Sequence, residues 1–318
     1  MPSRRTRNTA IAVAMEATYG ASPGTFAPIL LTDQPDFTID PDVVPRNLVR
    51  GYYGASEELA GTRRSVLKFK TELAGSSGLA TPPEWGKLIR GCGFMETIIP
   101  TLRVEYTPIT QTQESVTIKF NRDGVQYLGR GGRGTGKLDM KAYDRPTIDW
   151  EFWLFDTQAT AVAVGSPDYT PWQRPLVVTD FNSGNIKLGS AYAAGALTGG
   201  TTYNSRGMMI DIGNKLEHMR MLGNESIDIT SREMTGQMTV ELDTATELTW
   251  RTDINANTLI SQSFNLGPGG SNVGVFNANV QRTKPQTIDY QGKLLMQVDL
   301  RLLPLAVGGN DECKIFVK

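Results

Sequence analysis

The stretch whose residue types most suggest chemistry is Gly129–Lys137, GRGGRGTGK. It contains the G-x-x-x-x-G-K spacing of a phosphate-binding loop, in which backbone N–H groups and the lysine hold phosphate. Leu138 stands where such a loop needs Ser or Thr, and the following residues alternate like a strand instead of opening a helix. An arginine- and glycine-rich segment that binds nucleic acid is a second interpretation. The sequence favours a third, a flexible loop between two strands.

Other groups that could do chemistry are few and scattered. Asp149 and Glu151 lie two residues apart on one strand face, a spacing that could serve a glycosidase-like pair, but solvated charge on a sheet is favoured. His218 is the only histidine, which excludes a multi-histidine metal site and any triad that does not use it. Cys92 and Cys313 are the only cysteines, and Cys92 falls on an apolar helix stripe, as a buried free thiol does. We therefore predict no enzymatic activity, no cofactor and no metal.

The composition describes an ordinary folded protein. The chain has 318 residues and a formal net charge of -1, so no broad positive field points to nucleic acid. Its 33 glycines and few helical patterns indicate mostly β structure with many turns. The N-terminal MPSRRTRNTAIAVAMEA imitates a signal peptide, but Glu16 interrupts the short apolar run and no cleavage region follows. No run approaches the ~18 apolar residues of a membrane helix, so we expect neither secretion nor a membrane anchor.

One stretch, Arg63–Phe94, carries the clearest secondary-structure pattern. Residues 67–73 alternate apolar and charged side chains, as a strand buried on one face does. Two prolines then precede Trp85, Leu88, Ile89 and Cys92, whose spacing places an apolar stripe along one side of a short helix. The spacing predicts a strand, a turn and a helix that packs on the sheet.

Weaker copies of these patterns recur later in the same order. The matched pairs are 28–33 with 175–180, the strand and helix of 67–92 with 238–257, and 146–150 with 286–290. Ordered self-similarity is the mark of an internal repeat. We predict a first domain over 1–164, including the N-terminal arm, and a second over 165–318, with the boundary in the turn-rich 165–171. Each half also contains an excursion rich in glycine and charge, 51–61 and 222–232, which suits a hairpin or loop projecting from a sheet. The expected fold class is β-rich α+β, with two tandem β-sandwich or barrel domains that each carry one helix.

Several motifs resemble the major tail tube proteins of long, non-contractile-tailed bacteriophages. They are Glu16–Gly20 (EATYG), Thr71–Ser76 (TELAGS), Pro83–Phe94 (PEWGKLIRGCGF), Tyr106–Pro108 (YTP) and Asn121–Gly124 (NRDG). The resemblance covers about the first 155 residues, and the second half joins it only through the internal repeat.

The resemblance implies a structural virion protein of the phage tail that assembles in the host cytoplasm. Six tube domains of this family form a ring around a channel, and stacked rings form the tube that carries DNA into the host. Two domains in one chain then imply a trimeric ring with pseudo-sixfold symmetry, and a hexamer if the second half is not a tube domain. Implied partners are further copies of the chain, the tape measure protein, the tail terminator, the tail tip proteins and DNA passing without sequence-specific binding.

Charged and aromatic residues on the arm and excursions are the expected contacts between subunits or rings. A polar or acidic inner wall would let DNA slide, since a lysine-rich wall would bind phosphate. The segment 129–137 would become ordered on assembly, its two arginines pairing with acidic groups on a neighbour. The candidate contact residues are Arg4, Arg5, Arg7, Tyr52, Tyr53, Glu57, Glu58, Glu225, Asp228, Arg130 and Arg133.

A function from a different class is a carbohydrate-binding or carbohydrate-active β-sandwich. Its support is a set of tryptophans that could stack on sugar rings: Trp85, Trp150, Trp153, Trp172 and Trp250. Trp85 on the helix stripe and Trp150 on an inward strand face are expected in the core, which favours the structural interpretation.

Overall fold

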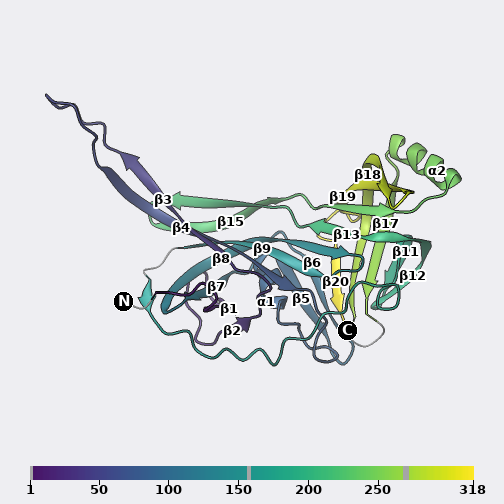
Figure 1. Ribbon diagram of the computed structural model, residues 1–318, viewed down its shortest axis with the longest axis horizontal. Helices are drawn as coiled ribbons and strands as arrows, with labels where there is room; N and C mark the ends of the chain where they lie inside the picture. Colours follow the sequence, from purple (N-terminus) through teal and green to yellow (C-terminus); the bar gives the residue numbers. More distant parts are fainter. Residues whose placement is uncertain (1–2, 156–158, 268–271) are drawn as a thin grey trace.

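A computed structural model describes residues 3–155, 159–267 and 272–318 (Figure 1). These residues form twenty strands and two helices, which confirms the predicted β-rich α+β class. The first part of the chain contains β1 (Thr9–Met15), β2 (Ala27–Ile29), β3 (Asp36–Pro45), β4 (Glu58–Glu72), α1 (Gly86–Gly91), β5 (Phe94–Ile99), β6 (Arg103–Pro108), β7 (Val116–Arg122), β8 (Val125–Lys141), β9 (Thr147–Phe155) and β10 (Thr160–Ala161). The rest contains β11 (Ile186–Ala193), β12 (Ala196–Tyr203), β13 (Ser205–Asp211), β14 (Asn214–Met221), β15 (Asn224–Arg232), β16 (Thr235–Val240), α2 (Thr244–Asn255), β17 (Leu259–Leu266), β18 (Val273–Tyr290), β19 (Lys293–Leu303) and β20 (Lys314–Val317).

The predicted strand and helix of the opening stretch are both present. Leu67 and Phe69 of β4 are buried, and β4 pairs with β9 so that Phe69 lies opposite Trp150. Helix α1 buries Leu88 and Ile89, and Gly93 follows it at φ +78°, the left-handed conformation that ends a helix. A Cβ on Gly91 would touch Phe152 of β9 and Val116 of β7, so α1 lies between two layers of strands and not on an outer face.

The pairing order of the first part of the chain repeats in the second. In the first, β3, β4, β9 and β8 are successive neighbours, and the far side of β8 continues through β7 to β1 and β2. In the second, β13, β16, β19 and β18 are successive neighbours, and β18 continues through β17 to β11 and β12. The helices also hold matching places, α1 between β4 and β7 along the chain and α2 between β16 and β17.

The two parts share one hydrogen-bonded network and one core. Residues 137–141 of β8 pair with β13, and β20 pairs with both β18 and β6. Buried apolar side chains from both parts form a single contiguous cluster. The division into domains 1–164 and 165–318 therefore stays a prediction.

The segment between the two parts runs along the outside of the first (Figure 1). Trp172 donates its indole N–H to the Pro28 carbonyl at 3.0 Å, and Val178 exchanges backbone hydrogen bonds with Tyr143 and Asp144. The turn-rich stretch 165–171 belongs to this connection.

One sequence match aligned strands that are not equivalent. Residues 147–150 belong to β9, whereas 286–290 form the end of β18, which pairs with β19. In the repeated order β9 corresponds to β19. Short alternating strands resemble one another because the same burial pattern selects similar residues.

Both predicted excursions are hairpins. β3 and β4 pair over most of their length and carry residues 46–57 at their tip, far from the body of the molecule (Figure 1). β14 and β15 form a separate two-stranded sheet with a tight turn at residues 222–223. The tip of the first hairpin lies between β3 and β4, and the β14–β15 hairpin lies between β13 and β16, the strands that correspond to β3 and β4. Both hairpins therefore occupy the same place in the repeated order.

Candidate assembly surfaces

A polar sheet face runs across the strands of both parts. Side chains on this face alternate with the core-facing apolar ones along β4, β9, β8, β13, β16 and β19. Its charges are arranged in cross-strand pairs, Lys68 with Glu151 and Lys70 with Asp149, each at 3.1 Å. Because opposite charges lie side by side, the face is strongly polar without a dominant sign.

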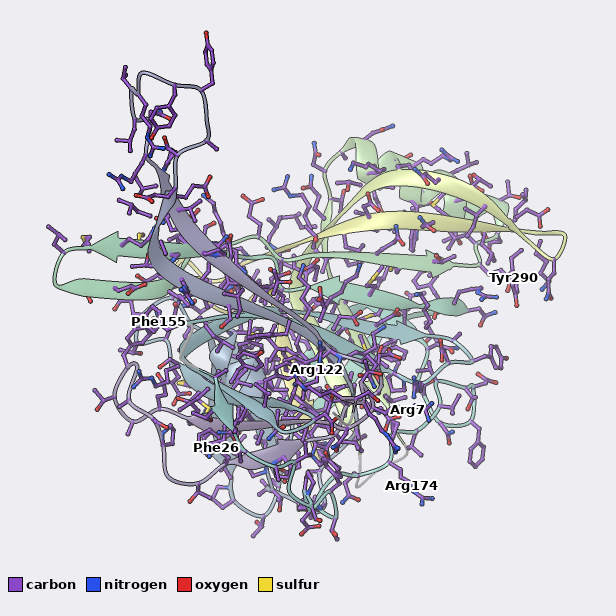
Figure 2. The ribbon with its side chains drawn as sticks, turned by 60° about the vertical axis from the view of Figure 1, so that its left-hand side comes forward. Arg7, Phe26, Arg122, Phe155, Arg174 and Tyr290 are labelled. Carbon is purple, nitrogen blue, oxygen red and sulfur yellow. The ribbon has the colours of Figure 1, made fainter. Side chains whose placement is uncertain are left out.

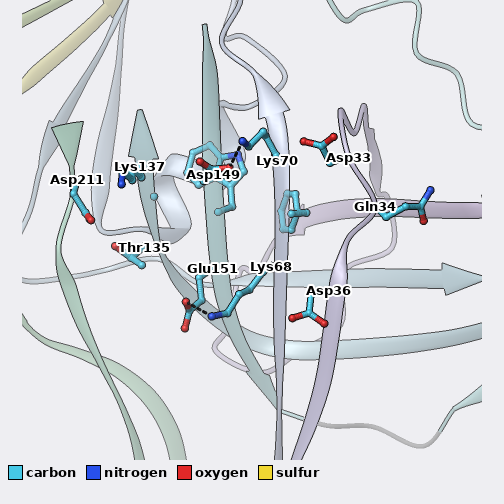
Figure 3. A pocket seen from close by; sticks show the side chains of 13 residues that line it. Asp33, Gln34, Asp36, Lys68, Lys70, Thr135, Lys137, Asp149, Glu151 and Asp211 are labelled. Carbon is cyan, nitrogen blue, oxygen red and sulfur yellow. Dashed lines mark ion pairs between the residues drawn. The ribbon is translucent and has the colours of Figure 1, made fainter. Parts of the chain in front are cut away.

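The centre of this face is hollowed into a cavity of about 420 Å³ (Figure 3). Besides those two ion pairs, its wall includes Asp36 of β3, Lys137 of β8 and Asp211 of β13. The prediction that Asp149 and Glu151 are solvated sheet-face charge is confirmed, because each is paired with a lysine opposite it and not with another carboxylate.

The sheet that bears this face has two open edges. Among the described residues, β3 pairs only with β4, and residues 282–290 of β18 pair only with β19. The successive pairings run β3, β4, β9, β8, β13, β16, β19 and β18, so β3 stands at one end and β18 at the other. Figure 2 shows Tyr290 far from the β3–β4 hairpin. Exposed strand edges attract further strands unless something covers them.

The β3–β4 hairpin carries four of the predicted contact residues. Tyr53 is fully exposed and Tyr52 is 69 % exposed at the tip. Glu57 forms an ion pair with Arg46 across the base of the tip, and Glu58 begins β4 opposite Pro45. The hairpin is thus a projecting arm with an aromatic end.

The β14–β15 hairpin uses its predicted residues inside the chain. Asp228 forms an ion pair with Arg133 of β8, and the Arg133 guanidinium also donates to the Ile227 carbonyl at 2.9 Å. Glu225 lies 2.7 Å from the His218 ring on the paired strand. Arg133 therefore already has a carboxylate partner in its own chain, and its contact with a neighbouring chain stays a prediction.

The segment 129–137 is part of strand β8 and not a loop, and it does not resemble a phosphate-binding loop in structure. Its glycines let the large side chains of β9 lie against the strand: a Cβ on Gly132 would come within 2.5 Å of Leu154, and one on Gly136 within 2.9 Å of Trp150. Arg130 is exposed opposite Phe155. Glycine abundance in this stretch reflects close packing, which the sequence alone did not distinguish from flexibility.

The N-terminal arm is fixed to the turn between β7 and β8. Arg4 donates to the carbonyls of Arg122 and Asp123, and the Asp123 carboxylate accepts from the Arg5 backbone N–H and from Asn8. These donors hold the pKa of Asp123 below its usual range. Arg7 is exposed.

Glu16, which was not among the predicted contact residues, organises the neighbourhood of Gly131. Its carboxylate accepts hydrogen bonds from the Gly20 and Gly131 backbone N–H groups, both at 2.8 Å, and from Ser115 and Thr117, both at 2.6 Å. Four donors on one carboxylate explain why glutamate stands at the start of the EATYG motif.

The neighbouring Tyr19 joins this cluster to the β14–β15 hairpin. Its hydroxyl accepts from the Ile227 N–H at 2.6 Å and donates to the Gly131 carbonyl at 3.2 Å. Burial, opposed by the Ile227 hydrogen bond and by Arg133, raises the pKa of Tyr19 to about 12.

A second unpredicted cluster ties the two parts of the chain together at Glu105 of β6. Its carboxylate accepts from Tyr192 of β11, from Arg103, and from Lys314 of β20 at 3.1 Å. Burial alone would raise the pKa of Glu105, but these three donors outweigh it and lower the pKa.

The tryptophans offer little for a carbohydrate site. Trp85, Trp150, Trp172 and Trp250 are buried, as predicted for the first two. Trp153 lies on the polar face beneath the Arg64 guanidinium, 4.0 Å from it. Stacking on a sugar needs an open ring face, and none of these five tryptophans offers one, since four are buried and Arg64 covers the fifth. They therefore do not form the aromatic platform that the carbohydrate-binding alternative requires.

No helix among the described residues is long and apolar enough to cross a membrane. No group of three or more His, Cys, Asp or Glu side chains in residues 3–155, 159–267 and 272–318 is arranged to hold a metal ion.

Comparison with known proteins identifies the family. No curated protein matches the chain in a sequence search. A family model described as phage tail tube protein matches residues 6–301, which includes both parts of the repeated pairing order. This chain is a member of the phage tail tube protein family and a structural component of a phage tail.

Proposed function

We propose that this chain self-assembles into rings of three copies that stack into the tail tube. The observation that carries the proposal is the repeated pairing order, in which β3, β4, β9 and β8 correspond to β13, β16, β19 and β18. If each set is one tube unit, with a division near 165, a chain contributes two and three chains contribute six. A ring of six chains remains the alternative, with the second part as decoration.

The polar sheet face is proposed as the wall of the channel. It spans both units without interruption because β8 pairs with β13, so copies joined edge to edge would form a closed polar surface. Two lysines of this face are already paired with carboxylates, Lys68 with Glu151 and Lys70 with Asp149. Paired lysines have little charge left for DNA phosphate, so DNA would pass along this wall during ejection into the host without being held.

Stacking between rings is assigned to the projecting groups. Tyr52 and Tyr53 at the hairpin tip offer large exposed rings, which suit the buried centre of a protein interface. Exposed Arg7 and Arg130 are proposed as polar contacts at the same junction. Head-to-tail stacking of identical rings has no closing step, so tube length must be set by other tail components: the tape measure, terminator and tip proteins.

Negative-stain electron microscopy of the concentrated chain tests the proposal. Rings and tubes with an open channel are expected, and native mass spectrometry of isolated rings should count three copies. Six copies per ring would replace the trimer by the hexamer. A protein that remains monomeric at high concentration, in low and high salt, would contradict the tube function itself.

A further inference from the structure

One of the junctions between the two units of the chain, the pairing of β8 with β13, joins equivalent sheets and has a complete structure. Residues 137–141 of β8 pair antiparallel with residues 207–211 of β13. The equivalent strand edges at the ends of the sheet, β18 and β3, have no such partner among the described residues. The internal junction can therefore serve as a template for the junction between two copies.

The strand register identifies which residue of β3 corresponds to which residue of β13. Glu72-Leu73 at the end of β4 matches Glu241-Leu242 at the end of β16, which aligns these strands at an offset of 169 residues. Val66 of β4 then corresponds to Thr235 of β16. Thr38 lies opposite Val66, and Asp211 lies opposite Thr235, so Thr38 holds the place of Asp211.

The same reasoning aligns β8 with β18. Through β4 and β16, Asp149 of β9 corresponds to Gln297 of β19. Lys137 of β8 lies opposite Asp149, and Gln286 of β18 lies opposite Gln297. Gln286 therefore holds the place of Lys137, which in the internal junction pairs directly with Asp211.

The β14–β15 hairpin adds a second part to the template, because it is seated on the first unit. Asn214 donates to the carbonyls of Cys92, at the end of α1, and Gly134, at 2.7 and 2.9 Å. Arg133 of β8 contacts Asp228 and the Ile227 carbonyl. The seat thus consists of β8 and the C-terminal end of α1.

The equivalent β3–β4 hairpin does not lie on β18 or on the end of α2 of its own chain; there it contacts the β14–β15 hairpin, through an ion pair between Asp42 and Arg220. Ile212, the residue after β13, is 1 % exposed, whereas Ile39 in the corresponding place is 38 % exposed. Val43, Val44 and Leu59 further along the hairpin are 45 %, 54 % and 51 % exposed. A hairpin with this much open apolar surface has the character of an element that is buried on assembly.

The second unit presents the matching surface without an occupant among the described residues. Gln281 of β18 lies opposite Arg301 of β19, and Arg133 of β8 lies opposite Trp153 of β9, the strand that corresponds to β19. Gln281 therefore holds the place of Arg133. The Gln281 amide donates to Asn257 at the C-terminal end of α2, at 2.9 Å. Leu259, the first residue of β17, is 44 % exposed beside this end of the helix.

We propose that β3 of one copy adds to the open edge of β18 of the next with Thr38 opposite Gln286, while its β3–β4 hairpin lies over the C-terminal end of α2. This arrangement copies the internal junction residue for residue and buries the exposed hairpin side chains. It rests on the proposed ring assembly and adds the register and the seat of the arm.

Disulfide cross-linking in assembled tubes tests the register. Directly opposed cross-strand residues have Cβ atoms about 4.5–5.5 Å apart, close to disulfide geometry. Thr38→Cys combined with Gln286→Cys should link neighbouring chains, and non-reducing electrophoresis should show dimers and trimers. Native Cys92 and Cys313 are buried and should not react.

Two matched pairs control the experiment. Asp211→Cys with Lys137→Cys, the template pair, should close within one chain. Thr38→Cys with Tyr290→Cys moves one partner four residues along the same strand, about 13 Å, and should not link. Tubes whose chains link through residue 290 and not through residue 286 overturn the register but leave the tube function unaffected. A wild-type chain that forms no rings contradicts both the register and the tube function.

Hydrogen exchange covers the case in which the cysteine variants fail to assemble. In wild-type tubes the amides of residues 37–39 and 286–290 should gain protection relative to the free subunit, and absence of that gain overturns the edge pairing.

The seat of the hairpin is tested by the double variant Val44→Asp with Leu59→Asp, which should leave the subunit folded and raise its critical concentration for assembly at least tenfold. Val307→Asp, at a fully exposed position outside the hairpin, is the control and should assemble normally; equal behaviour of the two variants overturns the seat.

Discussion

At the scale of single residues, this protein uses carboxylates as structural acceptors. Glu16 collects four hydrogen bonds from the β1, β7 and β8 region. Glu105 collects three, from both parts of the chain. Their partners come from separate strands, so the fold brings together donors that are far apart in sequence.

Replacing Glu16 should destabilise the fold. Glu16→Ala removes a charged acceptor and leaves the Gly131 N–H and the Thr117 hydroxyl without it, so the free energy of unfolding should fall by about 2–4 kcal/mol. Denaturant unfolding measures this directly. Glu16→Gln keeps one acceptor oxygen and should lose less; an equal loss for both variants would contradict the hydrogen-bonding explanation.

Glu105 predicts a dependence of stability on pH. Its pKa is lowered in the folded protein, so its contribution is present above the unfolded-state pKa, about 4.3, and is lost as the pH falls through the folded-state value. Glu105→Gln should lower the melting temperature at pH 7, and the difference from wild type should shrink below about pH 4.5. Glu247→Gln, at an exposed pair with Arg251, should show little change at any pH. A pH-independent difference for Glu105→Gln would rule out the ionised form as the source.

At the scale of elements, β8 is the strand that connects the layers. It pairs with β7 along its first half, with β9 along its middle and with β13 at its end. Its glycines allow Leu154 and Trp150 of β9 to pack across it. A segment that looks like a flexible loop is thus held between three strands.

Gly132→Ala tests this packing. The new methyl would lie 2.5 Å from Leu154 Cδ2 and 2.7 Å from the Val116 carbonyl, and the carbonyl cannot move without shifting β7. We expect a loss of about 1–3 kcal/mol in unfolding free energy. Gly24→Ala is the matched control, since nothing lies within 4 Å of its Cβ position. Similar stability of the two variants would refute the packing role.

At the scale of the whole molecule, the continuous polar face and the two open edges are features of the same sheet. In the proposed ring, edges that pair between copies would extend the face around the channel, and the balance of its charges would become a property of the channel wall. This balance predicts weak interaction with DNA.

Removing the negative charges of this face should strengthen its interaction with DNA. Asp149→Asn with Glu151→Gln frees Lys70 and Lys68, and the unassembled subunit should then bind duplex DNA with an affinity that falls as salt rises. Fluorescence anisotropy with a labelled duplex measures the effect. Glu217→Gln with Glu247→Gln, two half-buried glutamates outside the face, should not produce this binding. Salt-sensitive DNA binding by the wild-type chain would contradict the proposed wall along which DNA slides.

Local sequence patterns were sufficient for the β-rich class, the strand at 67–72, both helices and the places of the two excursions, which were expected as hairpins or loops. Each depends on interactions within a few residues: alternation of burial, an apolar stripe, or a turn. The resemblance carried by motifs such as EATYG and PEWGKLIRGCGF also led to the correct family. These properties belong to the sequence itself.

Tertiary structure alone decided the rest. Arg133 pairs with Asp228 of its own chain, and residues 129–137 form a strand, because β9 and the β14–β15 hairpin pack on them from distant parts of the sequence. The equivalence of β9 with β19, missed by short matches, appears only in the pairing order. Which edges stay open likewise depends on every strand finding its neighbour, and no local pattern encodes that outcome.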